Sequence, residues 1–263
     1  MEPLITRREP PTWEALEEAV RGILAECAMT AERQVPIALP RGGVATVDVR
    51  ATEVVHGISS TIICECKNWK SNIPQEVVFG FRTVMIEAGA NRGYVISKAG
   101  FQAGAILAAH ATNIELVTFE AFQARYFDKW IAARTWSLEH AVGGIGSYYE
   151  PFGIPGMDKI EDEAERERYY QVWRKYLFVG AILPGFSPYM RTLGRAPPLP
   201  ELPINLEGVA NYDIVVPDDL AAAAGYQEFL ELLESYAKEA LVALRSMNPN
   251  TRDKAPDAVE RDD

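Results

Sequence analysis

The chain has 263 residues, 48% of them hydrophobic, and a formal net charge of −11. It is long enough and apolar enough for one large domain, or for an ordinary domain with a substantial extension. The net charge argues against indiscriminate binding of nucleic acid, which depends on Lys and Arg neutralising phosphates. The charge is also uneven, because residues 1–135 hold 14 Lys and Arg against 15 Asp and Glu, so most of the acidity lies in residues 136–263.

Neither a membrane span nor a disulfide is expected. No window approaches the roughly 18 consecutive apolar residues that span a bilayer, and the first residues, MEPLITRREPP, lack the apolar stretch of a secretory signal. We therefore expect a cytoplasmic protein that makes no membrane contact. Cys27, Cys64 and Cys66 are an odd set without the paired spacing of a zinc site, and we interpret them as reduced, buried side chains.

The first element is predicted to be a helix that Thr12 caps, with an apolar stripe running from Trp13 to Leu24. Two β-rich runs follow, RQVPIALP and VATVDVRATEVV, and the turn between them consists of Pro40, Arg41, Gly42 and Gly43. A third run, STIICECKN, is β-branched and partly continuous in apolarity, as is typical of an inner strand. Three strands are therefore expected after the first helix.

From Pro74 onward the pattern alternates between helix and strand. Helical spacing runs from Pro74 until Gly89 ends it, and then strands at 93–97 and 114–119 alternate with helices at 101–111 and 120–133. The order α-βββ-α-β-α-β-α predicts an α/β fold, in which helices flank a mixed central sheet on both faces.

The second half of the chain is less regular. The glycine-rich stretch 140–156 is typical of a loop, 161–183 of a charged helix, and 184–217, with seven prolines, of an extended segment. Residues 226–245 have the spacing of an amphipathic helix. Everything after Met247 is polar and is expected to be disordered. We predict a first domain over 1–135, a mainly helical extension of unknown role over 136–246, and a disordered tail over 247–263.

Three charged residues on the predicted inner strands indicate a catalytic centre. Glu65 and Lys67 share one face of their strand, and Asp48 can face Glu65 if the two strands are neighbours. Two carboxylates this close attract a hard divalent cation, and a lysine beside them can position or help deprotonate a water and offset charge on a phosphoryl group. The pattern D…ExK also arises by chance, and the same residues can form an exposed ion pair on an amphipathic sheet.

The arrangement of these residues resembles the PD-(D/E)xK nuclease superfamily, and the segment from Trp13 to Phe119 is similar to its Mrr-type restriction-endonuclease branch. The similar features are Trp13-Glu14 at the start of the first helix, the glycine-rich turn before Asp48, ECK followed by Trp69, IPQEVV, and GANRGYVISKAGFQAGAILAA. The family's proline before the aspartate is Val47 here. The resemblance covers about the first half of the chain and implies a restriction-endonuclease-like core, DNA as substrate, Asp48 and Glu65 as metal ligands, and Lys67 as the catalytic lysine.

The resemblance also implies two additional site residues, Glu14 on the first helix and Gln75 at the edge of the site. For Glu14 an exposed carboxylate that complements the helix dipole is an equal alternative, and Glu17 is a less favoured substitute. From the residues alone, Trp69 and Lys70 are candidates for contact with nucleic acid, and Ser97 and Lys98 for contact with a phosphate near the next helix.

The function expected from these residues is a Mg²⁺-dependent, or Mn²⁺-dependent, endonuclease that cleaves DNA in restriction, phage defence or repair. Two alternatives remain open: a non-catalytic interaction module that keeps the nuclease fold, and a structure-specific nuclease acting on junctions or RNA. Because the first half has almost no net charge, we expect a homodimer or a partner that brings the DNA. Helix 226–245 is either a dimer surface or packs on its own nuclease domain, and the C-terminal helices are candidates for binding a partner protein.

Overall fold

The computed structural model describes residues 3–39, 42–205 and 214–253, so Pro40 and Arg41 of the predicted turn lie outside the described residues. The chain divides into two compact units, Met1–Arg134 and Thr135–Asp263. No helix in the described residues is both long and apolar enough to cross a membrane.

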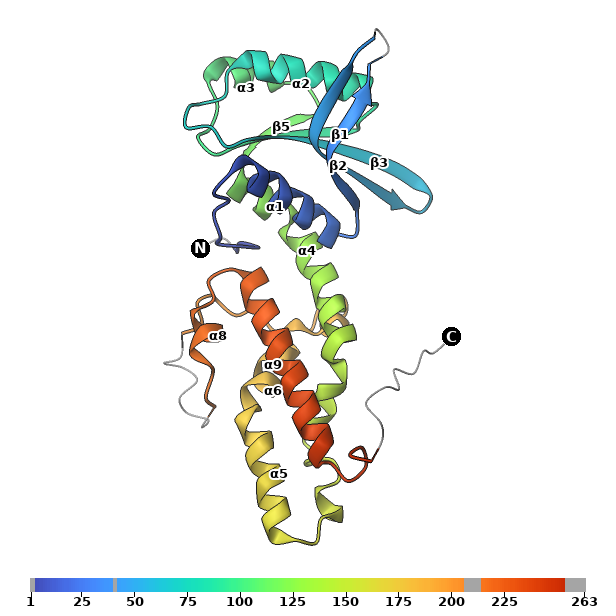
Figure 1. Cartoon of the computed structure of the whole chain (residues 1–263), viewed down its shortest axis with the longest axis vertical. Helices are drawn as coiled ribbons and strands as arrows, with labels where there is room; N and C mark the ends of the chain where they lie inside the picture. The colour runs from blue at the N-terminus through green and yellow to red at the C-terminus, as the bar shows by residue number, and fades with distance from the viewer. Residues whose placement is uncertain (1–2, 40–41, 206–213, 254–263) are drawn as a thin grey trace. The chain divides into compact units, whose positions relative to one another are not determined.

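The first unit has the predicted order of elements, α-βββ-α-β-α-β-α (Figure 1). The elements are α1 (Trp13–Glu26), β1 (Thr30–Ala38), β2 (Val44–Val55), β3 (Ile58–Lys67), α2 (Gln75–Glu87), β4 (Arg92–Ser97), α3 (Ala103–Ala109), β5 (Ile114–Thr118) and α4 (Phe119–Val142), the last of which continues into the second unit.

A five-stranded mixed sheet in the order β1-β2-β3-β4-β5 forms the centre of this unit. The strands β1, β2 and β3 are antiparallel, whereas β3, β4 and β5 are parallel. Val55 pairs with Ile58, and the two residues that join them, His56 and Gly57, both have positive φ, which is the geometry of a tight two-residue hairpin turn. The predicted mixed sheet with a β1–β2–β3 meander is confirmed.

The parallel strands bring polar residues to one edge of the sheet. Lys67 at the end of β3 pairs in register with Ser97 of β4, and Ser97 pairs with Thr118 of β5. Because parallel strands end at the same edge, side chains from three strands and from the loops after them meet there. This edge is where a site is expected.

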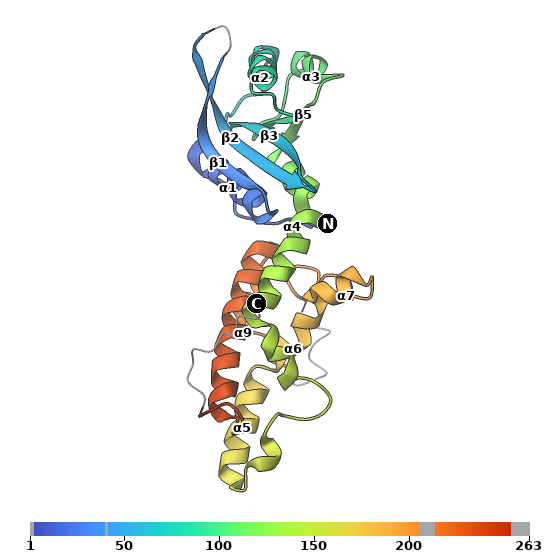
Figure 2. The ribbon, with the colours of Figure 1, turned by 90° about the vertical axis from the view of Figure 1, so that its right-hand side faces the viewer.

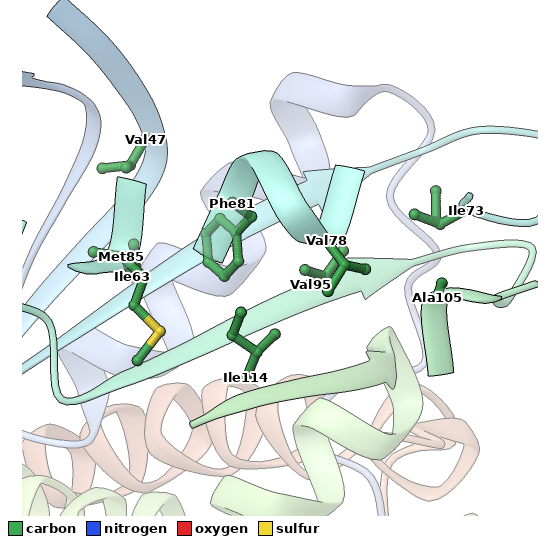
Figure 3. Close-up of a cluster of buried hydrophobic side chains, with 9 residues drawn as sticks. All are labelled: Val47, Ile63, Ile73, Val78, Phe81, Met85, Val95, Ala105 and Ile114. Atoms are coloured by element: carbon green, nitrogen blue, oxygen red, sulfur yellow. The ribbon is translucent and has the colours of Figure 1, made fainter. Parts of the chain in front are cut away.

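Helices cover both faces of the sheet, with α2 and α3 on one side and α1 and the first part of α4 on the other (Figures 1 and 2). On the α2–α3 side, strand residues pack against helix residues in one buried cluster (Figure 3): Val47, Ile63, Ile73, Val78, Phe81, Met85, Val95, Ala105 and Ile114. Gly93 of β4 permits this packing, because a Cβ there would lie 2.6 Å from Phe81 Cε1 and 3.0 Å from Met85 Sδ.

The opposite face is dominated by aromatic side chains. Tyr94 of β4 meets the rings of Phe122 and Tyr126 of α4 edge-on, with centroid distances of 5.4 and 5.9 Å. Trp130, fully buried, donates its indole N–H to Glu26 at the end of α1. These contacts hold α1 and the first part of α4 against the sheet.

The second unit is helical, as predicted, although its elements differ from the expected ones in detail. They are the end of α4, η1 (Gly143–Tyr148), η2 (Met157–Lys159), α5 (Glu163–Lys175), α6 (Leu177–Ile182), η3 (Leu183–Phe186), α7 (Pro188–Thr192), α8 (Asp218–Ala222) and α9 (Tyr226–Met247).

Four predictions for this region are corrected. The single helix 161–183 breaks at Tyr176 into α5 and α6. The extended segment contains η3 and α7, the latter capped by Ser187. The loop predicted from residue 140 begins with the last turn of α4 and then η1. Residues 248–253 are ordered, because Asn248 is buried and bonds to Tyr148 and Asn250, so a tail over 247–263 begins too early; residues 254–263 of it lie outside the described residues.

The apolar face of α9 is buried inside the second unit. Phe229 packs against Phe186 of η3, with ring centroids 5.8 Å apart, and Tyr236 meets Phe178 of α6 edge-on at 5.5 Å. Because α5, α6 and α8 pack on this helix, its apolar face already has partners within its own unit. Within its own unit the apolar face of α9 therefore forms a core, and the predicted roles of helix 226–245 in dimerisation and in packing on the nuclease domain stay predictions.

Candidate active site

An open cleft of about 450 Å³ lies at the sheet edge identified above and includes two of the three predicted catalytic residues. Its lining comes from the start of α1, from β1 and β2, and from β3 with the residues after it: Thr12, Trp13, Glu17, Gln34, Asp48, Cys66, Lys67, Asn68 and Trp69. The cleft is therefore built where the meander and the parallel part of the sheet meet.

Asp48 sits at a local distortion of the meander. The β1–β2 pairing runs on both sides of it but skips Asp48 and Gln34, and Gln34 has a φ of 51°. The backbone pairing between β2 and β3 ends at Val49 and Cys64. Beyond it, the Asp48 side chain links the two strands by accepting the N–H of Cys66 through Oδ2 at 2.7 Å. Burial, and then the negative charge of Glu65, raise the pKa of Asp48 from 3.8 to about 6, against the opposing effects of the Cys66 N–H and Lys67.

Glu65 and Lys67 form an ion pair on β3, as their shared strand face predicts. Both side chains are 21% exposed. Burial lowers the pKa of Lys67, but the hydrogen bond and charge of Glu65 and the charge of Asp48 outweigh burial and leave that pKa raised. Lys67 is therefore an ammonium ion at neutral pH, suited to stabilising negative charge rather than to taking a proton.

The carboxylates of Asp48 and Glu65 fit a divalent cation in charge and in donor type. Glu65 disfavours the ionised form of Asp48, as the raised pKa of Asp48 records, and a hard cation bound by both carboxylates would offset that repulsion. Within residues 3–39, 42–205 and 214–253, no group of three or more His, Cys, Asp or Glu side chains is gathered to hold a metal. The protein would thus supply two carboxylates, and water or phosphate oxygens would complete the shell.

The acidic residue that α1 contributes to the cleft is Glu17, not Glu14. Glu14 is exposed and does not line the cleft, whereas Glu17 is 1% exposed and does. Arg33 donates to Glu17 through Nη2 at 2.8 Å, and Gln34 donates through Nε2 at 2.9 Å. The family-implied role of Glu14 stays a prediction, and Glu17, which is buried and lines the cleft, is the better placed of the two carboxylates.

Gln75 and Lys70, two other predicted site residues, lie outside the cleft lining. Gln75 is exposed at the start of α2, and its Oε1 lies 2.9 Å from the point where a Cβ of Gly104 on α3 would be. The proximity of Gln75 to α3 is the reason it does not reach Asp48. Lys70 is exposed one residue beyond Trp69, which does line the cleft and whose ring centre is 5.8 Å from Lys67 Nζ.

Ser97 and Lys98 line a second cavity, of about 240 Å³, that shares Asn68 with the cleft. Ser97 is fully buried, and its hydroxyl donates to the carbonyl of Gly100 at 3.0 Å and accepts the Gly100 N–H at 3.1 Å. The hydroxyl thus fixes the turn between β4 and α3 rather than facing a ligand. Lys98 is exposed, with Glu9 3.6 Å away.

Glu17 was predicted only as a substitute for Glu14, and five further cleft residues were not predicted as site residues: Thr12, Trp13, Gln34, Cys66 and Asn68. Glu17 had a detectable signal, because it lies three residues before Val20 and seven before Leu24, on the buried stripe of α1. Gln34 had none, since its position depends on a left-handed backbone in β1. Asn68 follows the catalytic strand directly, and its amide donates weakly to the carbonyl of Pro11 at 3.4 Å.

Comparison with known proteins identifies a family for the first unit. Residues 11–126 match the family model Mrr_cat, described as a restriction endonuclease. The crystal structure of a protein of unknown function, AF1548, is similar with a TM-score of 0.37 and 13% sequence identity, over 60% of this chain and 93% of that chain. No curated protein matches the chain. Residues 11–126, a mixed five-stranded sheet flanked by helices, therefore form an Mrr-type, restriction-endonuclease-like domain of the PD-(D/E)xK kind.

Proposed function

We propose that the protein is a Mg²⁺-dependent, or Mn²⁺-dependent, endonuclease that hydrolyses phosphodiester bonds of DNA, with Asp48, Glu65 and Lys67 as its catalytic residues. The observation that carries the proposal is that Asp48 and Lys67 line one open cleft and Glu65 pairs with Lys67, while burial and Glu65 disfavour the Asp48 anion and the two carboxylates favour the Lys67 cation. Such mutual perturbation is typical of catalytic rather than purely structural charges.

Each residue has a distinct task in this proposal. Asp48, fixed by the Cys66 N–H, and Glu65 would hold the metal ion, which when bound supplies Lewis acidity and a more acidic water. Lys67 contributes a positive charge at the mouth of the cleft, where it offsets charge that develops on the phosphoryl oxygens. Glu65 keeps that ammonium group oriented toward the carboxylates. Glu17, tied to Arg33 and Gln34, gives the floor of the cleft a fixed shape.

The test is cleavage of plasmid, single-stranded and gapped DNA by the purified full-length protein with Mg²⁺ or Mn²⁺. Lys67→Ala is expected to reduce the cleavage rate about 100- to 1,000-fold, the effect of removing one electrostatic donor from a transition state. Asp48→Ala should also abolish metal binding measured by calorimetry. Arg82→Ala, which removes an exposed cation from α2 outside the cleft, is the control and should cleave normally. Equal cleavage by wild type and Lys67→Ala would refute the proposal.

The same measurements separate the alternative of a non-catalytic interaction module. That alternative requires the wild-type protein to bind neither Mg²⁺ nor Mn²⁺ at Asp48 and Glu65 and to leave every DNA intact. Restriction, phage defence and repair are the biological settings in which such an endonuclease would act, and plaque counts and survival after DNA damage in a deletion strain would distinguish them. The homodimer and the protein partner remain predictions, which sedimentation of the full chain would test.

A further inference from the structure

Two tryptophans stand at the mouth of the cleft with much of their surface in solvent. Trp13 is 51% exposed and Trp69 is 43% exposed, and both line the cleft that holds Asp48 and Lys67. Large apolar side chains left this open beside catalytic groups are informative, because the fold itself gains little from them there. Their flat faces are the surface that a nucleobase stacks on.

The backbone around both tryptophans is fixed. Thr12 caps α1 by accepting the N–H of Ala15 at 3.2 Å, so Trp13 is held in the first turn of the helix. Asn68, beside Trp69, donates to the carbonyl of Pro11 at 3.4 Å and so links the two tryptophan-bearing segments. Lys67 Nζ lies 5.8 Å from the centre of the Trp69 ring. A base on Trp69 would thus place its own phosphate within reach of the catalytic lysine.

Amide side chains in the same cleft suit the edge of a base. The NH₂ of Gln34 is directed at the Glu17 carboxylate, to which it donates at 2.9 Å, so its Oε1 is the atom that it can offer to a ligand. Asn68 lines the cleft as well. An amide can hydrogen-bond the Watson–Crick edge of a base only when that base is unpaired.

The charges around the cleft point in the same direction. Two cations at the cleft and beside it already form ion pairs, Lys67 with Glu65 and Arg33 with Glu17. Residues 1–135 as a whole hold 14 Lys and Arg against 15 Asp and Glu. Binding of an intact duplex depends on phosphate neutralisation, which this surface supplies poorly. Stacking on aromatic rings does not depend on that charge.

We propose that the cleft binds DNA whose base at the cleavage point is unpaired and stacked on Trp13 and Trp69, so that the substrate is single-stranded or gapped DNA rather than intact duplex. This inference rests on the proposed function for its choice of DNA and of the cleavage point. It assigns Trp13 and Trp69 to substrate recognition and Gln34 to contact with the base edge.

The experiment measures binding of the full-length protein, in EDTA, to one labelled DNA sequence presented as a single strand, as a gapped duplex and as an intact duplex. The first two are expected to bind about tenfold or more tightly than the third. Trp13→Ala and Trp69→Ala should each weaken binding of the unpaired forms about tenfold and leave duplex binding unchanged. Trp13→Phe and Trp69→Phe should retain most of the affinity. Phe79→Ala, which removes an equally exposed ring from α2, is the matched control and should behave as wild type.

An abasic nucleotide provides the second arm. Moving one abasic position along the single strand should reveal a site where base removal weakens wild-type binding about as much as Trp69→Ala does. At that position the abasic and Trp69→Ala losses should not add, since both remove the same stack. Tighter binding of the duplex, tighter binding of the matching RNA strand, abasic substitution without effect, or additive losses would each overturn the inference.

Failure here is distinguishable from failure of the proposed function. Binding in EDTA requires no cleavage. Selective, tryptophan-dependent binding without hydrolysis in Mg²⁺ or Mn²⁺ would therefore refute the proposed endonuclease activity and support the proposed recognition site. Conversely, duplex cleavage that needs Lys67 but neither tryptophan would keep the enzyme and overturn the inference.

Discussion

One carboxylate in each unit shows an opposite effect of its surroundings. In the first unit, burial and Glu65 raise the pKa of Asp48 to about 6. In the second, hydrogen bonds from Tyr176 and then Lys175 lower the pKa of Glu239. A charge that its neighbours favour stabilises the fold, whereas a charge that its neighbours oppose lowers stability at neutral pH. Glu18 of the first unit behaves like Glu239, because Arg21 lowers its pKa, so the contrast belongs to Asp48 and not to its whole unit.

Aromatic side chains pack on one another in both units, as Tyr149 stacks on Trp173 with ring centroids 5.7 Å apart in the second and Tyr94 meets Phe122 in the first. Trp13 and Trp69 differ from these packed rings, because they are about half-exposed at the cleft. Under the proposals above, the packed rings hold each unit together, whereas the cleft residues serve recognition and chemistry.

The largest effect that tests this comparison is expected in the core of the second unit. Phe229→Ala removes a fully buried ring from α9 and should lower the free energy of unfolding by about 3–5 kcal/mol. Hydrogen exchange should show the loss of protection in residues 135–253 and not in 13–118. Phe152→Ala, which removes a ring that is 90% exposed, is the control. Equal loss of protection in both units would break the division between them.

A smaller effect is expected at the floor of the cleft. Glu17→Gln removes the nearer carboxylate of Arg33 and leaves it only Glu18, 3.6 Å away, and should lower the free energy of unfolding by about 1–3 kcal/mol, with a fall in cleavage rate. Glu14→Gln on the same helix should change stability by less than about 0.5 kcal/mol and leave cleavage unchanged. Urea denaturation and plasmid cleavage of the pair measure both. A larger effect of Glu14→Gln would restore Glu14 as the site carboxylate.

The smallest effect has the opposite sign. The folded pKa of Asp48, about 6, lies above the ordinary value of 3.8, so the folded state binds that proton more tightly and wild-type stability falls as pH rises through this window. Asp48→Asn removes the penalty and should stabilise the metal-free protein at pH 8 by about 1–2 kcal/mol after allowance for solvent screening, and have no effect below pH 4. Asn retains an oxygen for the Cys66 N–H.

Glu239→Gln is the counterpart in the second unit and should destabilise the protein slightly at pH 8. The two substitutions together make the comparison quantitative, with denaturation in EDTA at both pH values as the measurement. A loss of stability in Asp48→Asn at pH 8 would contradict the assignment of Asp48 as a functional charge.

The sequence predicted the first unit well because its elements have strong local patterns. Alternation in VATVDVRA and the helix spacing before Gly89 set strands and helix without reference to the rest of the fold, and the order α-βββ-α-β-α-β-α is confirmed. In the second unit local pattern and fold disagree. Tyr176 interrupts a continuous helical sequence, and α7 forms among prolines because Ser187 caps it. Buried Asn248 has a polar sequence context that favours disorder, and only its bond to Tyr148 explains its order.

For the site, spacing on β3 was sufficient to predict the Glu65–Lys67 pair, since strand alternation fixes which side chains share a face. The choice between Glu14 and Glu17 needed only the helix period, which puts Glu17 on the buried stripe. The placement of Gln34 and of Trp13 depends on how three separate segments meet, and one-dimensional periodicity contains no information about that.

Gly93 belongs to the run GANRGYVISKAGFQAGAILAA, and its lack of a side chain has a structural role. With no side chain there, Phe81 lies directly on β4, and the spacing between α2 and the sheet is set by a ring rather than by a ring and a methyl group. The segment that carries Trp69 connects the end of β3 to the start of α2. Gly93 therefore sets how closely α2 can approach the sheet, and a larger residue there would push away the helix in which the Trp69 segment ends.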